Sequence, residues 1–134
     1  MNADMQDWLL LAGRILMTTV FFQSLHHHFG NFPGWIKALQ GWGVPYPMLG
    51  AVLADITILT SVVLLITGWY PGIAVLLLII FILFASGIGH RFWELQGQAR
   101  AMQYAIFTKN FSLIGGLLFY LVSGPGRFVM QHPW

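Results

Sequence analysis

The sequence contains no cysteine and few charged residues. Among 134 residues there are six lysines and arginines and four aspartates and glutamates, together 7% of the chain. Without cysteine, the chain has no disulfides, no iron–sulfur ligands and no thiol nucleophile of its own. Because the few basic residues form no cluster, the composition argues against nucleic acid as a partner. No phosphate-binding loop, nucleotide fingerprint or serine-hydrolase motif is present, which argues against a stand-alone hydrolase.

Apolar residues dominate instead. They form 57% of the sequence, and the mean hydropathy is +0.74, more than a soluble domain of this length can bury. Four segments are long and apolar enough to cross a bilayer, at residues 8–29, 48–68, 72–89 and 104–122. They show no period-two alternation, so they are predicted to be helices. The sequence therefore predicts an all-α integral membrane protein, an antiparallel four-transmembrane-helix bundle forming a single domain over residues 1–134.

The connections between these segments are short and carry turn signals. Residues 69–72 (WYPG) join the second and third segments, so we expect those two helices to pair as a hairpin. A loop rich in glycine, proline and tryptophan joins the first two, and residues 32–39 within it are predicted to form a short helix on the bilayer surface. Trp35 and Trp42 in this loop are interpreted as part of the aromatic belt at the membrane boundary.

Four crossings place both chain ends on one side of the membrane, which we name the terminal side. The opposite side, reached by the loops 30–47 and 90–103, is the loop side. The loop side carries Lys37, Arg91 and Arg100, whereas the terminal side carries Arg127. This excess of positive residues predicts that the loop side faces the cytoplasm.

Three ionisable residues lie inside the apolar segments: Arg14, Asp55 and Lys109. Each is a candidate functional residue, because a charge in the bilayer costs at least a few kcal/mol. Asp55 lies roughly 10 Å inside the loop-side boundary at 1.5 Å per residue, and Lys109 enters its helix from the same side. His28 and His90 lie near the loop-side ends of the first and third segments. All four helices are therefore expected to bring polar side chains to one layer near the loop side.

Helical spacing predicts which side chains face the bundle interior. On the first helix the predicted stripe contains Arg14, Thr18, Leu25 and His28. On the fourth helix it contains Lys109, Ser112, Gly116 and Tyr120. Arg14 lies nearer the terminal side, where it either snorkels or meets Thr60 and Ser61.

Two interpretations of the polar layer stay open. Asp55 and Lys109 either form a buried ion pair that only sets the helix register, or act on a ligand as catalytic residues. His28 and His90 could alternatively hold a haem b as axial ligands. Metal binding by the run His26-His27-His28 is disfavoured, because consecutive helical residues point about 100° apart. No metal site is predicted.

Several short motifs follow one another along nearly the whole chain, from Leu9 to Phe128. They are residues 11–16 (LAGRIL), 41–47 (GWGVPYP), 53–56 (LADI), 90–94 (HRFWE), 108–111 (TKNF), 115–118 (GGLL) and 124–127 (GPGR). In this order they resemble the DoxX family of small four-helix bacterial membrane proteins. Two departures are Asp55, where relatives usually carry glutamate, and the histidine run, where a glycine-containing segment with a single lysine is commoner.

The resemblance implies a multi-pass protein of the bacterial inner membrane in a redox setting. DoxX-like proteins are similar to the small membrane subunit of thiosulfate:quinone oxidoreductase and are linked to quinone chemistry and oxidative-stress systems. The partners implied are the lipid bilayer, a quinone and other redox subunits. Self-association into a homo-oligomer is a further candidate.

We therefore expect a membrane-embedded accessory or quinone-interacting subunit of an oxidoreductase system. In this hypothesis His28 and Lys109 donate hydrogen bonds to quinone oxygens, and Asp55 relays protons. His90 and Arg14 complete the candidate cofactor-binding residues, although the main role expected for Arg14 is structural. The alternatives are a non-enzymatic structural, assembly or small-solute transport module, and a haem b electron carrier.

Overall fold

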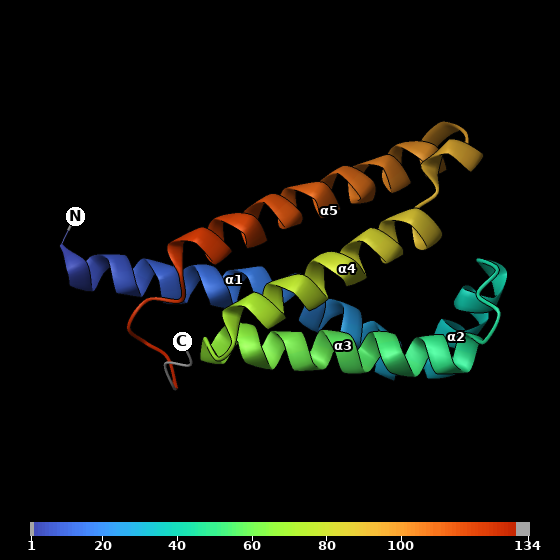
Figure 1. Cartoon of the computed structure of the whole chain (residues 1–134). Helices are drawn as coiled ribbons and strands as arrows, with labels where there is room; N and C mark the ends of the chain where they lie inside the picture. The colour runs from blue at the N-terminus through green and yellow to red at the C-terminus, as the bar shows by residue number, and fades with distance from the viewer. Residues whose placement is uncertain (1, 131–134) are drawn as a thin grey trace.

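A computed structural model of the chain describes residues 2–130, and all regular secondary structure in that range is helical. The elements are α1 (Ala3–Gly30), α2 (Phe32–Gly41), α3 (Pro47–Thr67), α4 (Pro71–Gly89), the 3₁₀ turn η1 (Phe92–Glu94) and α5 (Gly97–Ser123). The four long helices, α1, α3, α4 and α5, are each long and apolar enough to cross a membrane. This confirms the predicted all-α membrane fold (Figure 1).

Two helices begin earlier than hydropathy predicts. α1 starts at Ala3 because the side chain of Asn2 caps it, accepting a hydrogen bond of 2.9 Å from the backbone N–H of Met5. α5 starts at Gly97 rather than near Tyr104, because the polar residues in its first turns are strong helix formers. Hydropathy reports only the part of a helix that lies in lipid, whereas helix propensity and capping decide where the helix begins.

The helices pack as a chain of neighbours. The contact between α3 and α4 is the most extensive, which confirms the predicted hairpin, and α1 packs on α3 while α5 packs on α4. The α3–α4 turn is tight because Gly68 adopts a left-handed φ of 70° and Pro71 starts α4. The pair α1 and α5 is not among those in extensive contact within the described residues. Figure 1 shows these two helices diverging toward the loop side.

The core confirms one predicted stripe and corrects the other. On α1, Arg14, Thr18 and Leu25 are buried and His28 is half-buried, as predicted. On α5 the predicted stripe is wrong in its loop-side half, where Lys109 and Ser112 are exposed, whereas Gly116 is half-buried and Tyr120 is buried as predicted. The buried residues of α5 are Asn110, Leu117 and Tyr120. The reason is that α5 packs mainly against α4, so the face it buries points toward α4 and not toward a central bundle axis.

Arg14 is held by main-chain carbonyl groups. Its guanidinium donates hydrogen bonds of 3.1 Å to the carbonyl of Ile66 and 2.5 Å to that of Phe128, and the residue is only 1% exposed. Ile66 lies in the last turn of α3, where the negative end of the helix dipole favours a cation. The expected meeting with Thr60 and Ser61 is wrong: Thr60 is exposed, and the Ser61 hydroxyl donates to a carbonyl of its own helix.

The residues after α5 fold back across the terminal side, and we name residues 124–130 the C-terminal strap. The side chain of Arg127 pairs with Asp7 and Asp4 of α1, and these hydrogen bonds raise the pKa of the guanidinium. The backbone N–H of Met130 donates to the carbonyl of Thr67 at 3.1 Å. The strap thus ties the start of α1 to the end of α3.

We expect Gly68→Ala to lower the free energy of unfolding by about 1–2 kcal/mol or more, because Gly68 combines a left-handed backbone with no room for a side chain. A Cβ at this position would lie 2.5 Å from both the Arg14 guanidinium and the Val129 side chain. Gly72→Ala is the matched control, since a Cβ there meets nothing within 4 Å. Thermal unfolding in mild detergent checks this, and equal melting temperatures for the two variants would contradict the described turn.

Candidate functional site

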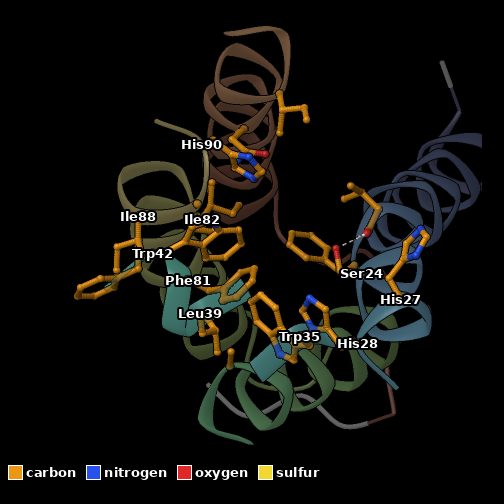
Figure 2. A pocket seen from close by; sticks show the side chains of 18 of the residues that line it. Ser24, His27, His28, Trp35, Leu39, Trp42, Phe81, Ile82, Ile88 and His90 are labelled. Atoms are coloured by element: carbon orange, nitrogen blue, oxygen red, sulfur yellow. Dashed lines mark hydrogen bonds between the residues drawn. The ribbon is translucent and has the colours of Figure 1, made fainter. Parts of the chain in front are cut away.

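A cavity of about 480 Å³ lies in the loop-side half of the protein, lined by residues of every long helix and of α2. Most of its wall is apolar or aromatic. The polar side chains in the wall are Gln23, Ser24, His27 and His28 of α1, His90, and Lys109 and Asn110 of α5. Figure 2 shows His28 and Ser24 facing His90 and Phe81 across the open centre. The polar layer predicted from the sequence thus surrounds a space that can hold a ligand.

The most sharply defined polar contact of this site joins His28 to Asp55. The two lie 2.6 Å apart, Nδ1 to Oδ1, and Asp55 is 5% exposed on α3. A carboxylate accepts the Nδ1–H, which selects the imidazole tautomer and leaves Nε2 on the opposite edge of the ring. His28 lines the cavity, so Nε2 is the nitrogen available to a ligand. The second carboxylate oxygen of Asp55 is buried without a hydrogen-bond partner among the described residues.

The turn from α1 into α2 places the indole ring of Trp35 over the imidazole of His28. Asn31 ends α1 and also caps α2, its side chain accepting a hydrogen bond of 3.1 Å from the backbone N–H of Gly34. A Cβ on Gly34 would lie 2.3 Å from the Asn31 side chain, so this side chain would have to shift if Gly34 were replaced. Trp35 follows at once, and its indole stacks on His28 with centroids 4.0 Å apart and planes within 7°.

The opposite wall is built from α4 and α5. Asn110 is buried and donates a hydrogen bond of 3.0 Å to the hydroxyl of Ser86, which ties α5 to α4. The ring of His90 shares a hydrogen bond of 2.8 Å with the side chain of Gln103. Lys109 is exposed at the cavity edge, and within residues 2–130 it forms no salt bridge. The described structure therefore does not contain the Asp55–Lys109 ion pair that the sequence left as one interpretation. Because α3 packs on α1, Asp55 meets His28 instead.

Aromatic side chains close the cavity toward the loop side. Trp35, the buried Leu39 and Trp42 line this end, which we name the roof. The Trp42 indole lies against Gly89, where a Cβ would come within 3.1 Å of the ring. Arg91 fastens the roof to α4 by donating hydrogen bonds of 3.1 Å to the carbonyls of Ile88 and Trp42.

The structure brings together most, but not all, of the predicted site residues. His28, His90 and Lys109 line the cavity, and Asp55 stands directly behind His28. Arg14 does not join them, because it is engaged by carbonyl groups near the terminal side. Haem ligation by His28 and His90 stays a prediction. Within the described residues, no group of three or more histidine, aspartate or glutamate side chains gathers as metal ligands.

Sequence reasoning missed the roof. The sequence predicts Trp35 and Trp42 only as part of the aromatic belt, whereas the structure places both on the cavity. The signal that bears on Trp35 is local, because an asparagine followed by a proline in the next turn favours a helix that starts at this point. Nothing in the sequence shows that Gly89 receives the indole of Trp42, since the two are far apart in the chain.

These features define a class: a small multi-pass helical membrane protein with a ligand-sized cavity near one face. The chain belongs to the DoxX family, whose model, described as DoxX, matches residues 9–91. It is also 30% identical over 124 residues to the inner membrane protein YphA of Escherichia coli strain K12, covering 92% of this chain and 89% of that protein. No solved structure matches the chain. The family and the four membrane-spanning helices make it a multi-pass protein of the bacterial inner membrane, in contact with the lipid bilayer.

We expect His28→Leu to be less stable than the double variant His28→Leu/Asp55→Leu. The single variant leaves a buried carboxylate without its donor, whereas the double variant removes both polar groups. The difference should be on the order of 1–3 kcal/mol. Unfolding by denaturant in bicelles measures it, with His26→Leu, at an exposed position of the same helix, as the neutral control. A double variant no more stable than the single one would contradict the described pair.

Proposed function

We propose that this protein is a membrane-embedded subunit of a redox system and that it binds the head group of a quinone in the cavity. The observation that carries the proposal is the imidazole of His28, oriented by Asp55 and facing an apolar, aromatic cavity inside the membrane. A hydrogen-bonding nitrogen at the edge of an apolar slot is what a quinone oxygen requires, because the ring is apolar and its oxygens are acceptors.

The shape and composition of the cavity support this assignment. Its volume of about 480 Å³ falls within the roughly 300–1,000 Å³ typical of small-molecule sites. Phe81 and the indoles of Trp35 and Trp42 offer flat apolar surfaces to a ring. Polar groups are confined to two walls, with His28 on α1 and Lys109 on α5. These two residues can therefore each meet one oxygen of a quinone ring placed between them.

A bound quinone supplies the electron- and proton-accepting chemistry, and the chain's own residues handle hydrogen bonds and protons. His28 donates from Nε2 when its ring is protonated and accepts there when it is neutral, since Nδ1 stays engaged by Asp55. The carboxylate fixes the direction of the ring by accepting from Nδ1. Asp55 is thereby a positioning residue, because it orients the His28 ring without lining the cavity itself. The electrons would come from another subunit of the system, a role consistent with the redox and stress setting associated with DoxX proteins.

A second candidate function has its own supporting observation. The His28–Asp55 hydrogen bond joins α1 to α3, as expected if the polar layer serves only to hold helices in a structural, assembly or transport module. In that case Asp55→Asn loses folded protein and there is no quinone binding to lose. A reduced-minus-oxidised difference spectrum of the purified protein separates the candidates further. A quinone bleaches in the ultraviolet, whereas a haem held by His28 and His90 gives sharp visible bands.

We expect His28→Gln to weaken quinone binding about tenfold, which corresponds to the loss of one hydrogen bond of ~1.4 kcal/mol. The probe is decylubiquinone, titrated into the protein in lipid nanodiscs and followed by quenching of tryptophan fluorescence, because two tryptophans line the cavity. The control is His26→Gln, since His26 is exposed and does not line the cavity. Unchanged affinity in His28→Gln, or no saturable quenching in the unaltered protein, would refute the assignment.

We expect Lys109→Met to weaken decylubiquinone binding by roughly tenfold or more, since a charge-assisted hydrogen bond is worth about 1.5–3 kcal/mol. Stability should change little, because Lys109 is exposed and makes no salt bridge within the described residues. Lys109→Arg, which keeps a cationic donor, should retain most of the affinity. The same titration measures both variants, and equal losses for methionine and arginine would argue against a hydrogen bond from this position.

A further inference from the structure

The cavity lies beside the gap between α1 and α5, the helices at the two ends of the row α1, α3, α4, α5 in which neighbours pack. α1 packs on α2 and α3, α3 on α4, and α4 on α5, but α1 and α5 are not in extensive contact. Both helices nevertheless contribute to the cavity wall, α1 through residues 20–28 and α5 through residues 106–113. Figure 1 shows α5 leaving α1 progressively toward the loop side. The cavity therefore occupies the space that opens where the two helices separate.

Exposed wall residues mark where the cavity meets its surroundings. Gln23 and His27 on α1 and Lys109 on α5 line the cavity and are themselves exposed. Gln23 lies seven residues before the end of α1 at Gly30, or roughly 10 Å along the helix axis. At that depth the surroundings of an inner-membrane helix are lipid chains rather than water. The opening between α1 and α5 thus faces the bilayer. The polar side chains at its edge, Gln23, His27 and Lys109, can form hydrogen bonds with lipid head groups or with ligand oxygens.

Side chains of the roof and of the hydrophobic core bound the cavity at its two ends. Toward the loop side, the roof lies over it: Leu39 is 7% exposed, and Trp42 is fastened by Arg91 and packed on Gly89. Toward the terminal side, the floor belongs to the hydrophobic core, where Phe21, Ile82 and Leu117 are at most 3% exposed. The exposed lining residues of α1 and α5 therefore mark the opening between these helices as the exit for a long hydrocarbon tail on a ligand in the cavity.

We infer that the cavity is loaded laterally from the loop-side leaflet, through the opening between α1 and α5. Its substrate class is accordingly a membrane-dissolved quinone that keeps its hydrocarbon tail in this opening. The identity of the head group rests on the proposed function, whereas the route rests on the helix arrangement alone. Lys109 and Gln23 stand on the two sides of the entrance, so the head group passes a donor on α5 and an amide on α1 before it reaches His28.

The absence of cysteine from the chain allows a direct test. Ala85→Cys, on the cavity wall, is labelled with a bimane fluorophore in nanodiscs. Quenching is compared between lipids with brominated acyl chains and aqueous iodide. Leu83→Cys, exposed on the same helix, is the control for lipid quenching, and Ala101→Cys, in the polar first turns of α5, is the control for iodide. We expect the Ala85 label to be quenched by the brominated lipids and protected from iodide.

A variant of the entrance completes the test. Gln23→Trp in the Ala85→Cys background should remove most of the lipid quenching, because the larger side chain fills the opening. Phe22→Trp, at the adjacent and lipid-exposed position, should leave the quenching unchanged. Quenching of the Ala85 label by iodide but not by lipid, or equal quenching in both tryptophan variants, overturns lateral entry. Since this readout needs no quinone, it can fail while decylubiquinone still binds, and it can succeed when decylubiquinone does not bind.

Discussion

A polar group inside a bilayer has to find its partner within the protein, and the rest of this structure follows from how three ionisable residues meet that requirement. Arg14 donates to main-chain carbonyls at the end of α3 and in the C-terminal strap. Asp55 accepts from His28 across the α1–α3 interface. Lys109 stays at an exposed edge, where its long side chain can reach polar surroundings. Two of the three charges fix helix positions, whereas Lys109 forms no salt bridge within residues 2–130.

The two ends of the bundle differ as a consequence. On the terminal side, Arg14 and the ion pairs of Arg127 draw α1, α3 and the strap together, so that end is packed. On the loop side, α5 is tied to α4 by Asn110 and Ser86, while α1 is tied to α3 by His28 and Asp55. The α3–α4 contact joins these two helix pairs, but within residues 2–130 no side-chain hydrogen bond joins α1 to α5. The cavity exists because the polar contacts hold the pairs but do not close the gap between them.

Hydropathy, turn residues and helical spacing were sufficient to predict the four spanning helices, the α3–α4 hairpin, the buried stripe of α1 and the polar layer near the loop side. These features depend on local sequence, since the length and apolar character of a segment decide whether it spans the membrane. The early starts of α1 and α5 were missed because capping and propensity act outside the lipid-facing residues. The loop-side half of the α5 stripe was misplaced because the face that α5 buries depends on which helix lies beside it.

Position along each helix was enough to predict that Asp55, Lys109 and His28 lie at a similar depth, because a helix rises by a constant amount per residue. Which of these side chains meet depends on how the helices pack against one another. Helix adjacency put α3 beside α1, so Asp55 bonds to His28 and not to Lys109. The same holds for the roof, since a tryptophan near the membrane boundary becomes a cavity wall only when the chain folds it over His28 or Gly89. Depth is a property of one helix, whereas a binding site is a property of several.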